Sequence, residues 1–253
     1  MICVIMQPTY FPWMGYFDLI DQSDTFVFLD DVKLASQSWM VRNRIKTSNG
    51  PIFLTVPISK EKNSENILIQ NALLANDKPW RKKHLKSIYY EYKKSGFFDE
   101  VYPWAEKIIN YPTDSLSEFN IQGITLICNL IGLNPTFIRS STTGIIDLTK
   151  DIKLVEICRR YNCEIYLSPQ GSSDYLEKKN PGGAFQDSGI DLYYHNYAHP
   201  TYPQSHGVFT SHMCILDLLF NVGLENAMKI IRSGRKANYH YLEFRKKILN
   251  ISQ

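Results

Sequence analysis

Histidines gather in one short part of this 253-residue chain. Four of the six fall between residues 195 and 212, in a segment interrupted by prolines. Because an imidazole titrates near neutral pH, His199 or His206 is a candidate general base. The spacing of these histidines matches no zinc template, and the only cysteine near them in sequence is Cys214, so we expect no metal site. The alternative interpretation is a proline-rich loop without a catalytic role.

Two polar turns follow apolar runs of the chain. Asp30 and Asp31 come directly after one run, where carboxylates can bind a ribose, a metal or a substrate amine, or can simply cap the next turn. Residues 168–175 (SPQGSSDY) follow another run. Their glycine and hydroxyl residues can form a nest of backbone donors for an anion, or an ordinary helix cap.

A basic row lies a little further along, in residues 39–46 (WMVRNRIK). Arg42, Arg44 and Lys46 alternate, so in an extended segment they share one face. Three cations beside Trp39 suit the recognition of phosphate or carboxylate groups, and Asn43 between them favours binding. A solvated edge strand kept soluble by its charges is the alternative.

The first turn of the chain is aromatic and proline-rich, reading QPTYFPWMGYF over residues 7–17. It resembles the phosphate-cradling turn of nucleotidyltransferase-like enzymes, in which a proline-containing loop precedes an HxGH element. Here Trp13-x-Gly15-Tyr16 takes that position and both histidines are missing. We expect the turn to bind a ligand, and a rigid turn that packs the sheet edge is the alternative.

The elements that must position these residues alternate between strands and helices. Short apolar runs at 2–6 and 25–29 flank an amphipathic segment at 15–23, which together predict a βαβ unit. Further strands are expected at 52–58, 136–139 and 164–168. Helices are expected from Pro79, from Asp114 or Ser115 to Gly132, after a cap at Thr149, and on both sides of Gly223. We therefore predict one α/β domain over 1–253 with a mostly parallel, Rossmann-like sheet and a helical insertion around 79–132.

Composition narrows the class of protein. Hydrophobic residues make up 44% of the chain and charged residues 21%, typical of a globular domain. The net charge of +3 gives little support for a nucleic-acid binder. The first apolar run is too short for a signal peptide or a membrane span, and the five cysteines show no CxxC spacing. We expect a cytoplasmic protein without membrane insertion. A homodimer is one of the assemblies that the sequence leaves open.

The motifs taken together resemble those of the WbqC-like family over nearly the whole chain. The resemblance rests on QP at 7–8, PWxGYF at 12–17, FxDDV at 28–32, RNRIK at 42–46, WRxxH at 80–84, YLS at 166–168, GxxDYL at 171–176, HPxYPQ at 199–204 and DLLFNxG at 217–223. It implies a bacterial protein associated with surface-polysaccharide (O-antigen) gene clusters. Many members carry a histidine where this chain has Gln7, which weakens any mechanism that needs an imidazole there.

Our leading hypothesis is an enzyme that transfers a glycyl or other acyl or aminoacyl group to the amine of a dTDP-type amino sugar. Its activated donor would be an acyl-CoA or an aminoacyl-tRNA, or ATP would be used. The alternatives are an ATP-dependent adenylylating ligase or nucleotidyltransferase, and a non-catalytic sugar-nucleotide binding protein. The expected catalytic residues are His199, Asp30 and Asp31. The expected substrate-binding residues are Gln7, Tyr10, Trp13, Tyr16, Trp39, Arg42, Asn43, Arg44, Lys46, Ser168, Gln170, Gly171, Asp174, Tyr202 and Gln204.

Overall fold

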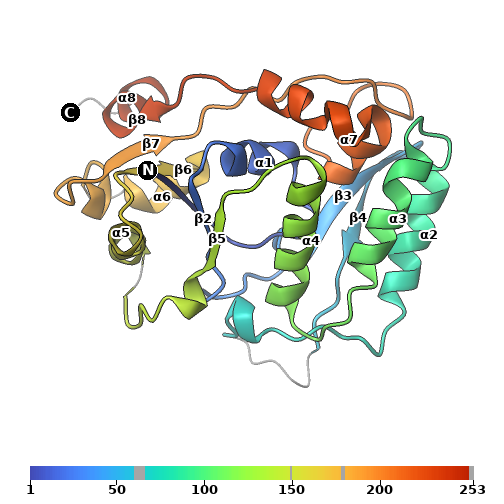
Figure 1. Ribbon diagram of the computed structural model, residues 1–253, viewed down its shortest axis with the longest axis horizontal. Helices are drawn as coiled ribbons and strands as arrows, with labels where there is room; N and C mark the ends of the chain where they lie inside the picture. Colours follow the sequence, from blue (N-terminus) through green and yellow to red (C-terminus); the bar gives the residue numbers. More distant parts are fainter. Residues whose placement is uncertain (60–65, 149, 178–179, 251–253) are drawn as a thin grey trace.

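A six-stranded sheet forms the centre of the computed structural model, which describes residues 1–59, 66–148, 150–177 and 180–250 (Figure 1). Its strands are β1 (Ile2–Met6), β2 (Thr25–Phe28), β5 (Thr136–Arg139), β6 (Ile165–Ser168), β7 (Asp191–Tyr194) and β8 (Tyr239–His240). They lie in the order β5-β2-β1-β6-β7-β8, and all neighbours are parallel except β7 and β8. This arrangement confirms the α/β, Rossmann-like prediction, and it places the reversal of strand order between β1 and β6.

Each face of the sheet is buried against different helices. Along β1, Val4 belongs to one hydrophobic core, and Cys3 and Ile5 belong to the other. The first core includes side chains from α1 (Met14–Asp21), and the second includes side chains from α5 (Lys150–Arg160). Because both faces are covered, the central strands consist of continuous apolar runs, which is the pattern that made them predictable.

An antiparallel hairpin stands apart from this sheet. It consists of β3 (Arg42–Thr47) and β4 (Gly50–Thr55), which pair with each other. The strand expected at 52–58 therefore begins and ends earlier than predicted. The side-chain amide of Asn43 donates to the carbonyl oxygens of Tyr10 and Phe11 at 3.1 and 2.8 Å, which ties the hairpin to the loop after β1.

Three α-helices, rather than the two expected, lie in the described part of the stretch between β4 and β5. They are α2 (Trp80–Tyr92), α3 (Phe98–Ile109) and α4 (Leu116–Leu130). Sequence reasoning missed α3, which contains Pro103 in its interior. The cap of α4 is confirmed at Ser115, whose hydroxyl accepts a hydrogen bond from the Glu118 N–H.

The C-terminal part holds α6 (Ser173–Leu176), α7 (Ile215–Ser233) and α8 (Tyr241–Lys247). Gly223 breaks the helical geometry of α7 with a φ of 79°, as the predicted interruption at this residue requires. The cap predicted at Thr149 lies outside the described residues. Within the described ranges, no helix is long and apolar enough to span a bilayer.

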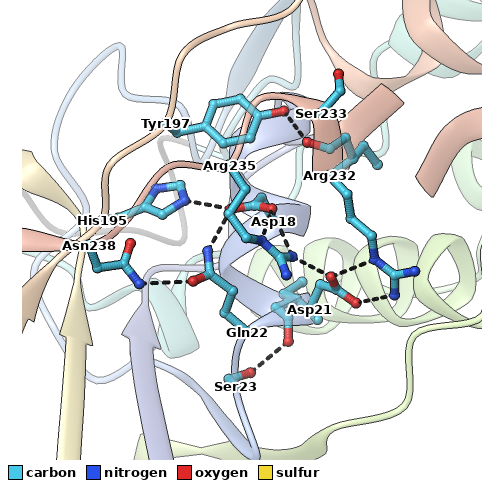
Figure 2. A network of polar contacts seen from close by, with 12 residues as sticks. Asp18, Asp21, Gln22, Ser23, His195, Tyr197, Arg232, Ser233, Arg235 and Asn238 are labelled. Atoms are coloured by element: carbon cyan, nitrogen blue, oxygen red, sulfur yellow. Dashed lines mark hydrogen bonds and ion pairs between the residues drawn. The ribbon is translucent and has the colours of Figure 1, made fainter. Parts of the chain in front are cut away.

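A polar network joins the first helix to the end of the chain (Figure 2). Asp18 of α1 is fully buried, and its carboxylate accepts hydrogen bonds from Arg235 at 2.9 Å and from His195 at 2.8 Å. Asp21 pairs with both Arg232 and Arg235. Burial alone would raise the pKa of Asp21, but hydrogen bonds from the two guanidinium groups hold it below its usual range. The network fixes the position of α1, whose first residues border the site described next.

Candidate functional site

Two adjoining pockets lie at the carboxyl ends of β1 and β6, where the strand order reverses. Met6, Thr9 and Trp39 line both, so the pockets form one cleft. The smaller, of about 360 Å³, is the aromatic pocket, further lined by Pro12, Trp13, Tyr16, Asn43, Arg44 and His212. The larger, of about 640 Å³, is the lysine pocket, whose lining includes Gln7, Lys150, Lys153, Pro169, Ser172 and Tyr175. Open α/β sheets bind their ligands at this position.

Trp13 organises the aromatic pocket. Its indole stacks on His199 with ring centroids 5.8 Å apart and planes at 12°, and it contacts His212 at 4.9 Å. The ring also lies directly over Gly15, where an added Cβ would come within 2.2 Å of the indole. The Gly15 of the motif is therefore required because any side chain there would collide with Trp13.

Two of the three tyrosines expected to bind substrate, Tyr10 and Tyr16, differ in their surroundings. Tyr16 lines the aromatic pocket, and its hydroxyl donates to the Gln7 carbonyl oxygen at 3.1 Å. Tyr10 is buried beneath the loop, where its hydroxyl lies 2.9 Å from Nδ1 of His84. Both side chains are only 2% exposed, so Tyr16 forms part of the wall of the aromatic pocket, whereas Tyr10 supports the loop from below.

The two imidazoles beside Trp13 also have different environments. Both ring nitrogens of His199 have partners: Nδ1 donates to the Pro200 carbonyl oxygen at 2.9 Å, and Nε2 accepts from the His212 backbone N–H at 3.0 Å. His212 lines the pocket, and among the described residues no group hydrogen-bonds to its Nε2. Burial lowers the pKa of both imidazoles, and the nearby charge of Arg44 lowers that of His212 further. The lowered pKa values favour neutral rings at pH 7, and the Nε2 of His212 is the imidazole nitrogen beside Trp13 that has no protein partner in the described part of the chain.

The three cations of the basic row separate in the structure. Arg44 lines the aromatic pocket, donates to the His212 carbonyl oxygen at 3.2 Å, and keeps a buried Nε that has no partner in the described part of the chain. Arg42 lies over the Phe53 ring at 4.5 Å. Lys46 is buried, and its ammonium donates to the Val208 carbonyl oxygen at 2.6 Å. Of the three, Arg44 is the cation that faces the cleft.

The two expected catalytic carboxylates hold other groups in place. Asp30 is 1% exposed, and it accepts hydrogen bonds from Ser117, from Ser140, and from both the hydroxyl and the backbone N–H of Ser141. Asp31 forms an ion pair with Lys153 at 2.6 Å. Asp30 therefore fastens the end of β2 to α4 and to the segment after β5, and Asp31 orients a lysine that lines the cleft.

The remaining expected residues lie around the cleft rather than in its lining. Tyr202 and Gln204 both donate to the buried carboxylate of Asp217. After β6, the Ser168 hydroxyl donates to the Pro169 carbonyl oxygen, and the Gln170 amide donates to the His195 carbonyl oxygen. Gly171 and Asp174 are exposed and fall outside both lining sets, whereas their neighbours Ser172 and Tyr175 line the lysine pocket.

Comparison with known proteins adds a family to this geometry. The WbqC-like protein family matches residues 7–229. The chain belongs to the WbqC-like family. An "Uncharacterized protein Rv1507c" from Mycobacterium tuberculosis is 30% identical over 223 residues, which cover 87% of this WbqC-like chain and 94% of that protein. No solved structure matches.

Several cleft residues of this WbqC-like protein escaped the sequence prediction of site residues, notably Thr9, Lys153 and His212. Thr9 lies inside the aromatic turn. Its side chain could have been assigned to the cleft only if the backbone geometry of that turn were known. Lys153 lies in a helix that was predicted from its apolar residues, and nothing in that pattern marks one of its lysines as a site residue. His212 was part of the histidine cluster, and what distinguishes it from His199 is the hydrogen bonding of the rings, which depends on tertiary structure.

Proposed function

We propose that this protein transfers an acyl or aminoacyl group, such as glycyl, to the amino group of a nucleotide-linked amino sugar of dTDP type. The product would enter surface-polysaccharide (O-antigen) synthesis. One observation carries the proposal: a single cleft at the strand reversal is lined by aromatic faces, by cations and by an imidazole whose Nε2 has no hydrogen-bond partner among the described residues. A nucleotide sugar presents rings, a pyrophosphate and, in this class, an amine, and each finds a matching group in the cleft.

The binding roles follow from the lining of the cleft. Trp13 and Trp39 offer flat faces for a base or a sugar ring, and Trp39 is 51% exposed at the junction of the two pockets. Arg44 has a buried N–H to donate, and the exposed Lys150 lines the other pocket, where Lys153 is already paired with Asp31. These cations suit the pyrophosphate, whose charge they would neutralise.

The transfer step requires a base for the amine. The amine nitrogen attacks the carbonyl carbon of the activated acyl group and forms the new N–C bond. The C–S bond of a thioester or the C–O bond of an aminoacyl ester breaks, and the leaving group departs with its electron pair. His212 takes the proton that the nitrogen loses, because its lowered pKa keeps the ring neutral at pH 7. His199 and Trp13 hold His212 in position.

Mass spectrometry of the sugar product tests this proposal. The purified protein is incubated with a panel of dTDP-amino sugars and, in separate reactions, acyl-CoA, glycyl-tRNA, or glycine with ATP. We expect a gain of one acyl mass with one donor and a fall of about 10²–10⁴ in kcat for His212→Ala. His240→Ala, on β8 at the far edge of the sheet, is the matched control and retains the rate.

The same experiment separates the alternatives. An adenylylating ligase or nucleotidyltransferase is favoured by Lys150 of the lysine pocket together with Arg44, which suit a triphosphate, and it would release pyrophosphate from ATP and an acid. A non-catalytic sugar-nucleotide binding protein would bind the panel without any mass gain. No mass gain with any donor refutes acyl transfer.

A further inference from the structure

Positive charge is concentrated on one helix of this nearly neutral chain. The segment 78–94, which contains α2, holds seven basic residues and one acidic residue, for a net charge of +6. The whole chain has a net charge of +3, so the remaining residues sum to −3. The near cancellation of charge in the composition therefore conceals a local excess of the kind that nucleic-acid binding requires.

The geometry of α2 arranges this charge as a strip. Its apolar side faces the core with Trp80, His84, Ile88 and Tyr92 buried. The opposite side presents the residues 4, 7, 8 and 11 positions after Lys82, which all lie within a sector of about 100° around the helix. These residues are exposed, and we call them the α2 strip: Lys82, Lys86, Tyr89, Tyr90 and Lys93.

The tyrosines of the α2 strip form part of a shallow groove between α2 and α3. Tyr89 and Tyr90 are 43% and 57% exposed, and Tyr89 rests edge-on against Tyr102 of α3 with centroids 5.8 Å apart. The ammonium of Lys93 lies 5.7 and 5.1 Å from the centres of the Tyr89 and Tyr90 rings. Aromatic faces and cations are thus interleaved on one surface.

We propose that the α2 strip is an RNA-binding site. Its lysines would contact phosphates, and its tyrosines would stack on unpaired bases, a combination that single-stranded nucleic-acid binding sites use. The one carboxylate in the groove, Glu106, can accept a hydrogen bond from an exocyclic amine of a base. An anionic membrane fits less well, because the apolar face of α2 is committed to the core and leaves no side that could insert.

This inference stands independently of acyl transfer, since RNA binding is measured without substrate or turnover. If both hold, the RNA surface favours an aminoacyl-tRNA as the donor over an acyl-CoA. A protein that binds RNA and transfers no acyl group would refute the function proposed above and leave this site intact.

Fluorescence anisotropy with a labelled single-stranded RNA of about 12 nucleotides measures the binding. Contacts from the three lysines to phosphates predict a slope of about −2 in log affinity against log salt, or a loss of about 20-fold between about 50 and 200 mM. Lys82→Gln/Lys86→Gln/Lys93→Gln should remove most of this slope. The matched control, Lys229→Gln/Lys236→Gln/Lys246→Gln, changes three exposed lysines elsewhere and should keep it.

A second variant separates stacking from charge. Tyr89→Leu/Tyr90→Leu keeps the apolar bulk and should weaken RNA binding by at least about fivefold with an unchanged salt slope. Absence of saturable RNA binding at low salt, or equal losses in the two lysine variants, overturns the proposal. Sedimentation with phosphatidylglycerol vesicles is the parallel arm, and vesicle binding through these lysines without RNA binding would assign the surface to a membrane instead.

Discussion

Replacing Gly15 by alanine would test the architecture of the aromatic pocket. Gly15 lies in the first turn of α1, and the Cβ of an alanine would fall 2.2 Å from the Trp13 indole. Carbon atoms cannot approach so closely, so the indole must leave its place. We expect the displacement to break its ring contacts with Tyr197, His199 and His212.

The magnitude follows from two opposing effects. Alanine improves helix propensity over glycine by about 1 kcal/mol. Loss of three ring contacts, at about 0.5–1.5 kcal/mol each, costs about 1.5–4.5 kcal/mol. The net expectation is a decrease of about 0.5–3.5 kcal/mol in the free energy of unfolding, although propensity alone predicts an increase.

Urea unfolding monitored by circular dichroism measures the stability, and acrylamide quenching reports the exposure of tryptophan. Together with the decrease in stability, we expect stronger quenching and a loss of nucleotide-sugar binding. Gly96→Ala is the control, because nothing lies within 4 Å of a Cβ built at that residue. A Gly15→Ala protein that is more stable than the parent and equally quenched would refute the packing of Trp13 described above.

Two further predictions concern buried ionisable groups. Burial lowers the pKa of His84 to about 4, so between pH 6.5 and 4 the unfolded chain binds more protons than the folded one. As the pH is lowered across this window, we expect the free energy of unfolding in urea titrations to fall by about 3 kcal/mol, and the profile of His84→Gln to be flatter. In the α1 network, Arg235→Gln removes the guanidinium from buried Asp18 and should cost about 2–4 kcal/mol of unfolding free energy. The side chain of Arg232 is 57% exposed, so Arg232→Gln should lower the free energy of unfolding by less than about 1 kcal/mol. Equal losses in the two variants would contradict the role given to Arg235 as the partner of buried Asp18.

The sheet was predictable because its signals are local. Strands such as β1 and β2, covered on both faces, consist of apolar residues throughout, and the order of elements along the chain implies parallel pairing. Two other elements were not predictable: β8 has only two residues, and α3, although it is 12 residues long, carries a proline that normally argues against a helix. Such elements owe their existence to packing against partners distant in sequence.

The position of the cleft was predictable from the sequence, but only some of the residues that line it were. Trp13, Tyr16 and Arg44 were expected to bind substrate, and they line it. Lys46 and Asp30 have the same residue types as ligand-binding groups, yet both are buried and satisfied by neighbouring protein groups. Residue type and strand-end position are encoded locally, whereas the choice between binding a ligand and bracing the fold depends on which donors and acceptors the rest of the chain brings near.

The ion pairs between α1 and the end of α7 determine how far the chain can be shortened before it no longer folds. The match to the WbqC-like family ends at residue 229, before both arginines that neutralise Asp18 and Asp21. A chain truncated there would leave Asp18 with His195 but without the Arg235 guanidinium, and Asp21 without either arginine. Both carboxylates belong to α1, the helix that begins at the aromatic pocket. The smallest autonomous folding unit therefore extends at least through Asn238, whose amide holds Gln22 of the same helix end, and limited proteolysis near residue 230 should unfold the N-terminal half rather than trim a dispensable tail.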